Sequence, residues 1–176
     1  MEMHRSIKHS LTVTIAILVS LGLAATARGI KEEDREILAG ISGIQVLVDE
    51  KIGTEAERAG LTWEVLQKDV ELRLRQAGVR VMTMKESLLV PGTPFLYLNV
   101  TTRENPGRHT FHLKLELMEK VRVERSPSLI LYGRTWNGRG RLVTVGTGNL
   151  GSVRENVREM VDEFISEYLA ANPRKP

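Results

Sequence analysis

The strongest pattern of hydrophobic and polar positions lies near the carboxyl end of the chain, between residues 152 and 169. Apolar side chains recur there at steps of three and four residues, which is the spacing of one face of an α-helix. Each buried side chain of this kind contributes about 1.5–3 kcal/mol, so the helix must pack against another apolar surface. The positions on this face are Val153, Val157, Met160, Val161, Phe164, Ile165, Tyr168 and Leu169.

A second amphipathic helix is predicted to begin after Thr62, whose hydroxyl group is suited to cap the first turn. Gly78 follows the last position of the pattern, and glycine commonly ends a helix because it adopts the left-handed backbone conformation without strain. These two helices are the main helices of the predicted fold. The apolar face of the second one consists of Trp63, Leu66, Val70 and Leu74.

Several segments show the patterns of β-strands, either as short β-branched runs or as alternating apolar and polar residues. Segment 95–102 is apolar on both faces, which predicts a strand inside the sheet. Segment 111–123 alternates, which predicts one buried face and one solvent-facing face. Its alternation breaks at Glu119, where we expect a bend or a bulge. The other predicted strands are 44–48, 79–83, 129–136 and 142–145.

Turn-forming residues separate the predicted strands. Asn137–Gly138 is typical of a tight β-hairpin and would pair the two strands that flank it. The helix that begins after Thr62 lies between two predicted strands, 44–48 and 79–83. This order fits a right-handed βαβ crossover, with an antiparallel placement left open. The fold class is therefore α+β: a single, mostly antiparallel sheet of about five strands with two main helices packed on one face. Other predicted turns are Pro91–Pro94, Asn105–Gly107 and Ser126–Pro127.

The amino-terminal residues have the pattern of a secretory signal peptide. Arg5 and Lys8 precede an uncharged, mostly apolar run from 11 to 25, and Ala25–Ala27 matches a small-x-small cleavage site. The run is about 15 residues long, short of the roughly 20 that span a bilayer. We expect cleavage after residue 27 and a periplasmic or secreted protein without a transmembrane segment; retention of the signal as an anchor is the alternative.

The chain is predicted to contain one folded domain. A length of 176 residues, less the signal, suits a single hydrophobic core. The predicted division is a signal peptide at 1–27, a charged lead-in at 28–43, a single α+β domain at 44–172 and a basic tail at 173–176.

Charge and cysteine content exclude several classes of function. The chain has 25 lysine and arginine residues against 22 aspartate and glutamate residues, in a well-mixed order, so no basic tract favours nucleic acid. It contains no cysteine, which excludes a lipid-modified cysteine, disulfides and thiol catalysis.

A glycine-rich loop before the last helix is the one candidate binding motif. Residues 146–151 match G-x-G-x-x-G, and backbone N–H groups at a helix start can hold an anion. No strand follows the helix, so the βαβ unit of a dinucleotide site is missing. In the alternative interpretation the glycines only shape a tight loop, and Ser152 with Glu155 forms a capping box. The predicted anion-binding residues are Gly146, Gly148, Gly151, Ser152 and Arg154.

Catalytic and metal-binding sets are not evident. His109 and His112 are the histidines beyond the predicted signal, and a three-residue step on a strand places them on opposite faces. We expect both on the surface, with no metal, no cofactor and no catalytic residue. The chain is accordingly predicted not to be an enzyme; the open alternative is a hydrolase, which would need a deep pocket that holds His109 or His112 beside a carboxylate.

Three segments carry a resemblance to known proteins. They are DVELRLRQAGVRV (69–81), PFLYLNV (94–100) and VDEFISEYLAANP (161–173). In these the chain resembles a family of uncharacterised exported bacterial proteins. The order of its elements is also similar to envelope domains of the TolB amino-terminal type and to penicillin-binding-protein activator lipoproteins. The resemblance implies an envelope location and supplies no functional residues.

The sequence therefore favours a non-enzymatic protein-interaction module of the bacterial envelope, with an unidentified envelope protein as its partner. Its contact surface is expected at a sheet edge or on the solvent-facing side of a strand, open to strand addition. The alternative is a binder of an anionic small molecule or lipid head group at the glycine-rich loop. The oligomeric state is left open. The residues of the expected solvent-facing surface are Lys114, Glu116, Lys120 and Arg122.

Overall fold

The computed structural model describes residues 36–49 and 52–173. All of these belong to one compact unit, which extends from Glu32 to Pro176. The predicted signal peptide and the first part of the charged lead-in lie outside the described residues. Within the described ranges, no helix is both long enough and apolar enough to cross a membrane.

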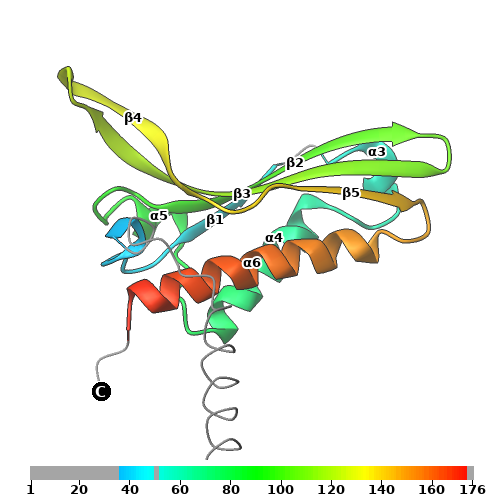
Figure 1. The fold of residues 1–176 in the computed structure, drawn as a ribbon, viewed down its shortest axis with the longest axis horizontal. Coiled ribbons are helices and arrows are strands. Elements are labelled where there is room, and N and C mark those ends of the chain that lie inside the picture. The colour runs from blue at the N-terminus through cyan, green and yellow to red at the C-terminus, as the bar shows by residue number, and fades with distance from the viewer. Residues whose placement is uncertain (1–35, 50–51, 174–176) are drawn as a thin grey trace, which may run out of the picture. The chain divides into compact units, whose positions relative to one another are not determined.

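The strands form one open sheet (Figure 1). β1 runs parallel to β2, β2 runs antiparallel to β3, and both β4 and β5 pair antiparallel with the other edge of β3. This confirms the predicted α+β class with a mostly antiparallel sheet. The strands are β1 (Gln45–Val48), β2 (Phe95–Asn105), β3 (Arg108–Val123), β4 (Ser126–Asn137) and β5 (Arg141–Gly146).

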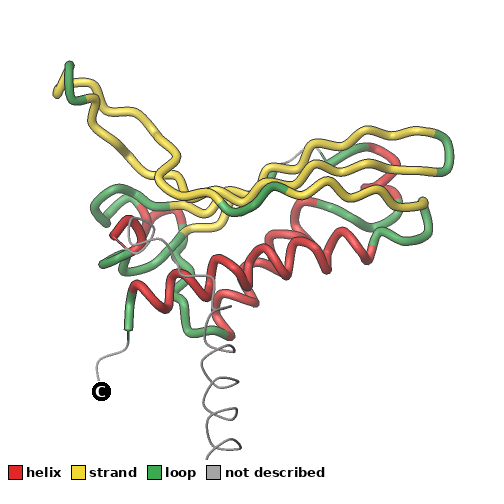
Figure 2. The backbone as a smooth tube through the Cα atoms, viewed as in Figure 1, coloured by secondary structure: helices red, strands yellow, loops and turns green. Residues whose placement is uncertain are grey.

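The two main helices pack on one face of this sheet (Figure 2). The hydrophobic core lies between them and the apolar residues of β2 and β3, several of which are fully buried. Trp136 at the end of β4 closes one side of the core, with its ring 4.9 Å from that of Phe164 in an edge-on arrangement. The helices are α3 (Thr54–Arg58), α4 (Trp63–Gln76), α5 (Met84–Ser87) and α6 (Gly151–Ala171).

α6 confirms the helix predicted from its apolar stripe. Every position of the stripe from Val153 to Tyr168 is buried, and Leu169 is partly buried against the core. The hydroxyl group of Tyr168 donates to the carbonyl oxygen of Ile41 at 2.6 Å, and burial raises the pKa of this tyrosine. Trp136 donates its indole N–H to Glu167 at 2.6 Å, which ties the helix to β4.

α4 also agrees with its predicted boundaries. The Thr62 hydroxyl accepts a hydrogen bond from the Val65 backbone N–H, and Gly78 has a positive φ of 79° after the last turn. Ion pairs join α4 to α6: Arg73 to Asp162, and a two-bond contact from Arg154 to Asp69 at 2.6 and 2.9 Å. The helices are thus held to each other as well as to the sheet.

The strand predicted at 79–83 is wrong. Only a single parallel bridge forms there, between Ile44 and Val81. The extension stops because Thr83 and Glu86 close a capping box, which starts the short helix α5 at Met84. The parallel direction of the bridge agrees with the predicted crossover and not with the antiparallel alternative, but no βαβ unit of regular strands results.

The hairpin predicted at Asn137–Gly138 is also wrong. β4 and β5 do not pair with each other, because β3 is long enough to offer them successive stretches of one edge. The Gly138 N–H donates to the Leu115 carbonyl oxygen at 2.9 Å, so the connection itself follows β3. The turn expected at Ser126–Pro127 instead lies at residues 124–125, and β4 starts at Ser126.

The irregularity expected near Glu119 is confirmed. The pairing of β3 with β4 shifts register between Leu117 and Met118, where Leu117 opposes Trp136 but Met118 opposes Arg134. Thr135 is therefore the extra residue of a bulge. It lies where β3 and β4 leave the rest of the sheet.

Candidate functional site

β3 and β4 continue past the end of the sheet as a two-stranded projection, which we call the arm and define as residues 119–135. The first residue of β2, Phe95, lies opposite Met118, so the part of β3 beyond Met118 has β4 as its strand neighbour and β2 no longer beside it. Figure 1 shows the arm bending away from the layer of helices. Neither of its faces is covered by α4 or α6.

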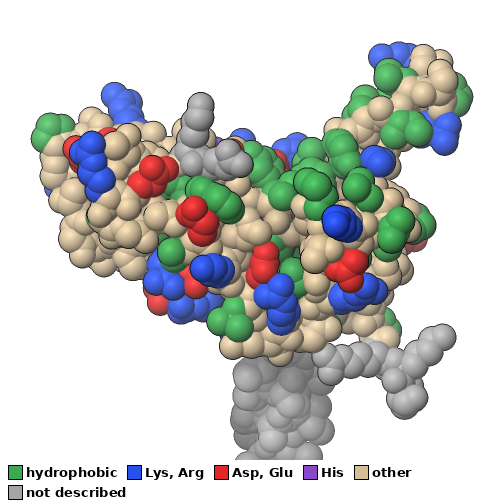
Figure 3. Space-filling model, turned by 180° about the vertical axis from the view of Figure 1, so that it is seen from behind, with side chains coloured by type: hydrophobic (Ala, Val, Ile, Leu, Met, Phe, Trp, Pro, Cys, Tyr) green, Lys and Arg blue, Asp and Glu red, His purple; other side chains and the backbone are tan. Residues whose placement is uncertain are grey.

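The arm exposes a continuous apolar segment. Leu129, Ile130, Leu131 and Tyr132 are 49, 52, 43 and 44% exposed. In a sheet that is covered on one side, alternate residues of such a run would be buried. Here all four are exposed because the arm has no second layer on either face. Figure 3 shows hydrophobic and basic side chains along the projecting arm.

The pairing register separates the two faces of the arm. Val121 lies opposite Leu131, whereas Lys120 lies opposite Tyr132 and Arg122 opposite Ile130. Because side chains alternate along a strand, one face is aliphatic and the other combines apolar and basic groups. The Lys120 ammonium lies 5.9 Å from the centre of the Tyr132 ring. The arm can therefore contact apolar groups on both sides.

Specific contacts hold the base of the arm. Thr135 donates its hydroxyl to Glu119 at 2.7 Å, and Arg134 donates to Glu116 at 2.7 Å. The Lys120 N–H donates to the Gly92 carbonyl oxygen at 2.7 Å. These bonds fix the direction in which the arm leaves the sheet.

The structure separates the predicted anion-binding residues into two groups. Gly146 ends β5, Gly148 lies in an exposed turn and Gly151 opens α6, so the loop residues do lie together. Arg154 instead points to α4, where the Asp69 carboxylate binds its guanidinium and raises its pKa. The site stays a prediction, and its one cation already has a partner.

The capping box predicted for Ser152 and Glu155 is wrong. The N-cap of α6 is Leu150, without a side-chain cap, and Ser152 lies inside the first turn. The Ser152 N–H donates to the Asn149 carbonyl oxygen, so the preceding turn winds directly into the helix. Glu155 pairs with Arg158 instead.

The prediction that both histidines lie on the surface is wrong for His109, which is fully buried, whereas His112 is partly exposed on the opposite face. His109 has the same parity as Phe111, so the buried face of β3 begins one alternation earlier than the sequence suggested. Within the described residues, neither of its ring nitrogens has a hydrogen-bond partner, and Nε2 lies 3.7 Å from Glu55. No group of three or more metal-ligating side chains occurs among the described residues.

Asp49, at the end of β1, is fully engaged in structural bonds. It accepts hydrogen bonds from the Tyr97 hydroxyl at 2.7 Å, the Asn99 amide at 2.6 Å and the Val100 N–H at 3.0 Å. Burial, and then the hydrogen bond to Asp49, raises the pKa of Tyr97. This carboxylate therefore anchors the edge of the sheet and is not a free general base.

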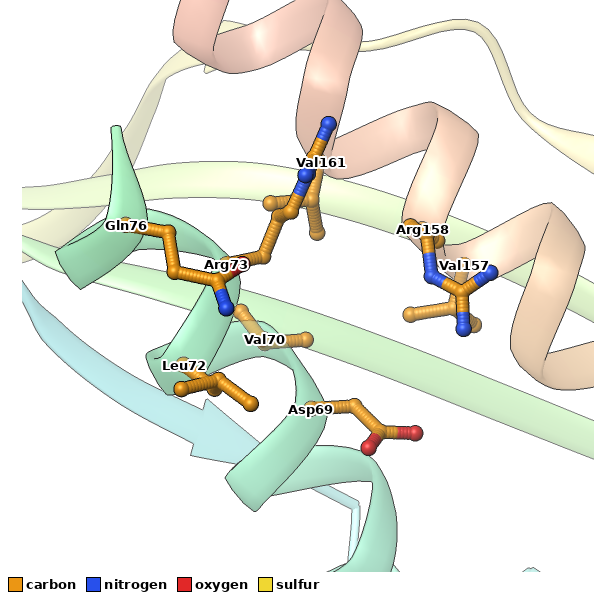
Figure 4. Close-up of a pocket in the computed structure, with 8 residues that line it drawn as sticks. All are labelled: Asp69, Val70, Leu72, Arg73, Gln76, Val157, Arg158 and Val161. Atoms are coloured by element: carbon orange, nitrogen blue, oxygen red, sulfur yellow. The ribbon is translucent and has the colours of Figure 1, made fainter.

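A cavity between α4 and α6 is too small for an ordinary ligand (Figure 4). Its volume is about 100 Å³, whereas small-molecule sites typically measure roughly 300–1,000 Å³. Val70, Val157 and Val161 line it, and charged groups stand at its rim, among them Asp69 and Arg158. It is a packing gap between two helices.

Comparisons with known proteins assign no family. No family model matches the chain. No curated protein matches it either.

Two solved structures are similar over most of the chain. One is a dodecamer of a PelC variant from Paraburkholderia phytofirmans, with 17% identity, coverage of 76% of this chain and 91% of that chain, and a TM-score of 0.34. The other is a minor lipoprotein from Acinetobacter baumannii, with 12% identity, coverage of 77 and 96%, and a TM-score of 0.26. These likenesses assign no function to this chain, and they do not show the similarity to TolB-type or activator domains.

Proposed function

We propose that this chain is an exported protein of the bacterial envelope that acts, without catalysis, by binding protein through the arm. The observation that carries the proposal is the exposure of Leu129–Tyr132 on a projection whose base is held by specific contacts. Contiguous exposed apolar residues on a folded domain commonly mark a contact surface.

The envelope location is supported by the sequence of the amino terminus. Basic residues, a short apolar run and Ala25–Ala27 follow one another in the order of a cleavable signal. Cell fractionation and amino-terminal sequencing of the product test this directly. We expect the exported product to begin at Arg28, and a cytosolic product that retains Met1 would contradict export.

Binding is favoured over catalysis by the state of the polar groups. The carboxylates of Asp49, Glu119 and Asp69 are each engaged by neighbouring side chains or backbone groups. The cavity between α4 and α6 measures about 100 Å³, and a larger one lined by residues of β1 and α4 measures about 280 Å³; both fall below the roughly 300–1,000 Å³ of typical small-molecule sites. The arm offers four consecutive exposed apolar side chains, Leu129–Tyr132.

The arm contains part of the surface expected from the sequence. Lys120 and Arg122 belong to it, whereas Glu116 is bound by Arg134 at its base. Lys114 lies outside the arm, earlier on β3, opposite Asn99 of β2. The proposed contact surface is thus centred nearer the tip of β3 than the sequence indicated.

Site-specific photo-crosslinking in living cells tests the binding site. A photo-reactive amino acid replaces Ile130 in one variant and Leu142 of β5 in the control; both native side chains are exposed. We expect a discrete protein adduct from position 130 and none from position 142. Equal yields at the two positions would contradict binding through the arm.

A further inference from the structure

We infer that His109, Glu55 and Glu104 form a proton-controlled contact that holds the short helix α3 against the sheet. When the imidazole of His109 carries a positive charge, it binds the Glu55 carboxylate and fixes the helix. When the imidazole is neutral, the contact loosens. α3 lies at the end of the sheet far from the arm (Figure 1), so this inference does not depend on the proposed function.

His109 is a buried polar side chain that the fold leaves without a hydrogen bond. It is 0% exposed, and among the described residues neither Nδ1 nor Nε2 has a hydrogen-bond partner. Buried polar groups in folded proteins are nearly always paired, so an unpaired imidazole at this depth is unusual. A packing role alone does not account for it, because an apolar side chain would fill the same space without burying two unpaired nitrogen atoms.

Two carboxylates from different elements face the imidazole. Oε2 of Glu55, on α3, lies 3.7 Å from Nε2 of His109, just beyond hydrogen-bond distance. Glu104 of β2 lies directly opposite His109 in the strand pairing, and so on the same face of the sheet. Among the described residues, no lysine or arginine pairs with either carboxylate. A proton on His109 therefore brings a positive charge to two negative ones.

The other described neighbours of His109 on the sheet place no charge beside its ring. Val145 of β5 lies opposite it, and the ring of Phe111 lies 6.2 Å away. Arg103 and Arg108 have the other parity on their strands, so they lie on the opposite face of the sheet. Burial of the ring disfavours its charged form, and the two carboxylates favour it. Only the charged ring gains the ion pair that the neutral ring lacks.

Glu104 also connects this site to the backbone of α3. Its Oε1 accepts hydrogen bonds from the N–H of Glu55 at 2.8 Å and from the N–H of Ala56 at 3.3 Å. The N-cap residue of α3, Gly53, supplies no side-chain cap, so β2 supplies the cap instead. α3 has five residues, and a helix this short is stable only through contacts with the rest of the fold.

The charge on His109 therefore controls how firmly α3 is held. Charge-assisted N–H···O bonds are about 2.7–2.9 Å long, so a movement of about 1 Å by the Glu55 side chain completes the bond. A neutral ring can donate one N–H but carries no charge that attracts the carboxylate. Histidine side chains change charge between about pH 5 and pH 8. We expect the contact to be complete at the acid end of this range and to be lost as the pH rises.

Hydrogen exchange of the α3 amides tests the contact. It is measured on the exported chain at about pH 5.5 and about pH 8 and corrected for the pH dependence of the intrinsic exchange rate. We expect protection of the Ala56 and Glu57 amides to be at least fivefold lower at the higher pH, with α6 as an unchanged reference. Glu55→Gln should abolish the difference, and the variant should fold because this side chain is 54% exposed.

Glu57→Gln is the matched control, because it removes a carboxylate from the same turn of α3 and leaves Glu55 in place. The difference in protection should persist in this variant. Equal protection of the wild-type helix at the two pH values overturns the inference, as does a pH effect that Glu55→Gln leaves intact.

NMR titration of the imidazole nitrogens gives an independent measurement. The ring signals of His109 and the amide signal of Ala56 should change together, with one common midpoint. His112→Gln is the control, because this histidine lies on the opposite face and is partly exposed. A His109 ring that keeps one charge state from about pH 5 to pH 8 overturns the inference. The proposed function is tested separately, because none of these outcomes alters crosslinking at position 130.

Discussion

β3 passes through two environments, and the comparison between them explains most of the molecule. Between Phe111 and Leu117, its odd-numbered residues lie under α6 and α4 and are fully buried. Val121 continues the same alternation in the arm but is only partly buried. The alternating pattern therefore defines a face of the strand, while the extent of the neighbouring strands and helices decides whether that face is covered.

β4 shows the same contrast over a shorter distance. Trp136 is 4% exposed against the core, whereas Tyr132, four residues earlier, is 44% exposed. The bulge at Thr135 lies between these two residues, and the Glu119 carboxylate accepts a hydrogen bond from the Thr135 hydroxyl. β4 is thus buried in the core at its carboxyl end and exposed to solvent in the arm.

The largest expected difference between the two regions is in the cost of removing an apolar side chain. Phe164→Ala removes a fully buried ring that packs against Trp136, and we expect a loss of about 3–5 kcal/mol in the free energy of unfolding. Leu131→Ala in the arm should cost less than about 1 kcal/mol at concentrations where the chain is monomeric. Urea unfolding of both variants measures this, and equal losses would show that the arm is covered.

A smaller effect is expected from overpacking the arm. A Cβ atom added at Gly133 would lie 2.6 Å from Cγ2 of Val121, so the Val121 side chain or the backbone beside it must shift. We expect Gly133→Ala to destabilise the arm locally by about 1–3 kcal/mol, visible as faster hydrogen exchange of β4 amides with little change in α6. The double variant with Val121→Ala should restore protection. Uniformly faster exchange throughout the sheet would contradict independence of the arm from the core.

The local elements of this fold could be read from the sequence. The apolar stripe of α6, the Thr62 cap and the end of α4 at Gly78 depend on residues within a few positions of each other, and all three are confirmed. The wrong predictions concern strand pairing between residues that are far apart in the sequence. Asn137–Gly138 is a good hairpin dipeptide, but its strands pair with β3, because the length of β3 offers more hydrogen-bonding edge than a hairpin would.

The candidate site was only partly visible in the sequence. Lys120 and Arg122 were selected as polar positions on β3, while the apolar side chains of the arm were assigned to an ordinary strand. A usable signal was present: residues 129–132 are apolar on both parities and have no helix segment to cover them. His109 was missed for a similar reason, because nothing local reveals that β5 pairs with the start of β3 or that Glu55 of α3 lies near His109.

A still smaller effect is expected at the ion pair between α4 and α6. Arg154 and Asp69 are partly exposed, so solvent weakens their attraction. We expect a double-mutant cycle with Arg154→Gln and Asp69→Asn to give a coupling of about 0.2–1 kcal/mol. A coupling well above this range would show that the pair is more buried in solution.

Arg154 also provides a test of the hypothesis that the glycine-rich loop binds an anion. If phosphate binds the glycine-rich loop, it should raise the melting temperature of the wild-type chain, and Arg154→Ala should abolish the rise. Arg158→Ala is the matched control, because its guanidinium pairs with Glu155 on the same helix. A phosphate effect that Arg154→Ala leaves intact would remove this arginine from the site.

The smallest expected effect concerns α5, close to the turn that receives Lys120 of the arm. The Thr83 N–H, the Arg80 guanidinium and the Thr83 hydroxyl all donate to the Glu86 carboxylate, which lowers its pKa from 4.5 to about 2. Because the folded state favours the ionised carboxylate, its stabilising contribution is complete above about pH 4.5 and is lost as the pH falls towards 2. Glu86→Gln removes this contribution at every pH. We therefore expect the variant to melt below the wild type at pH 6 and the two melting temperatures to converge near pH 2. A gap of constant size over this range would mean that the carboxylate is not the group that titrates, and the capping box would then contribute through its shape alone.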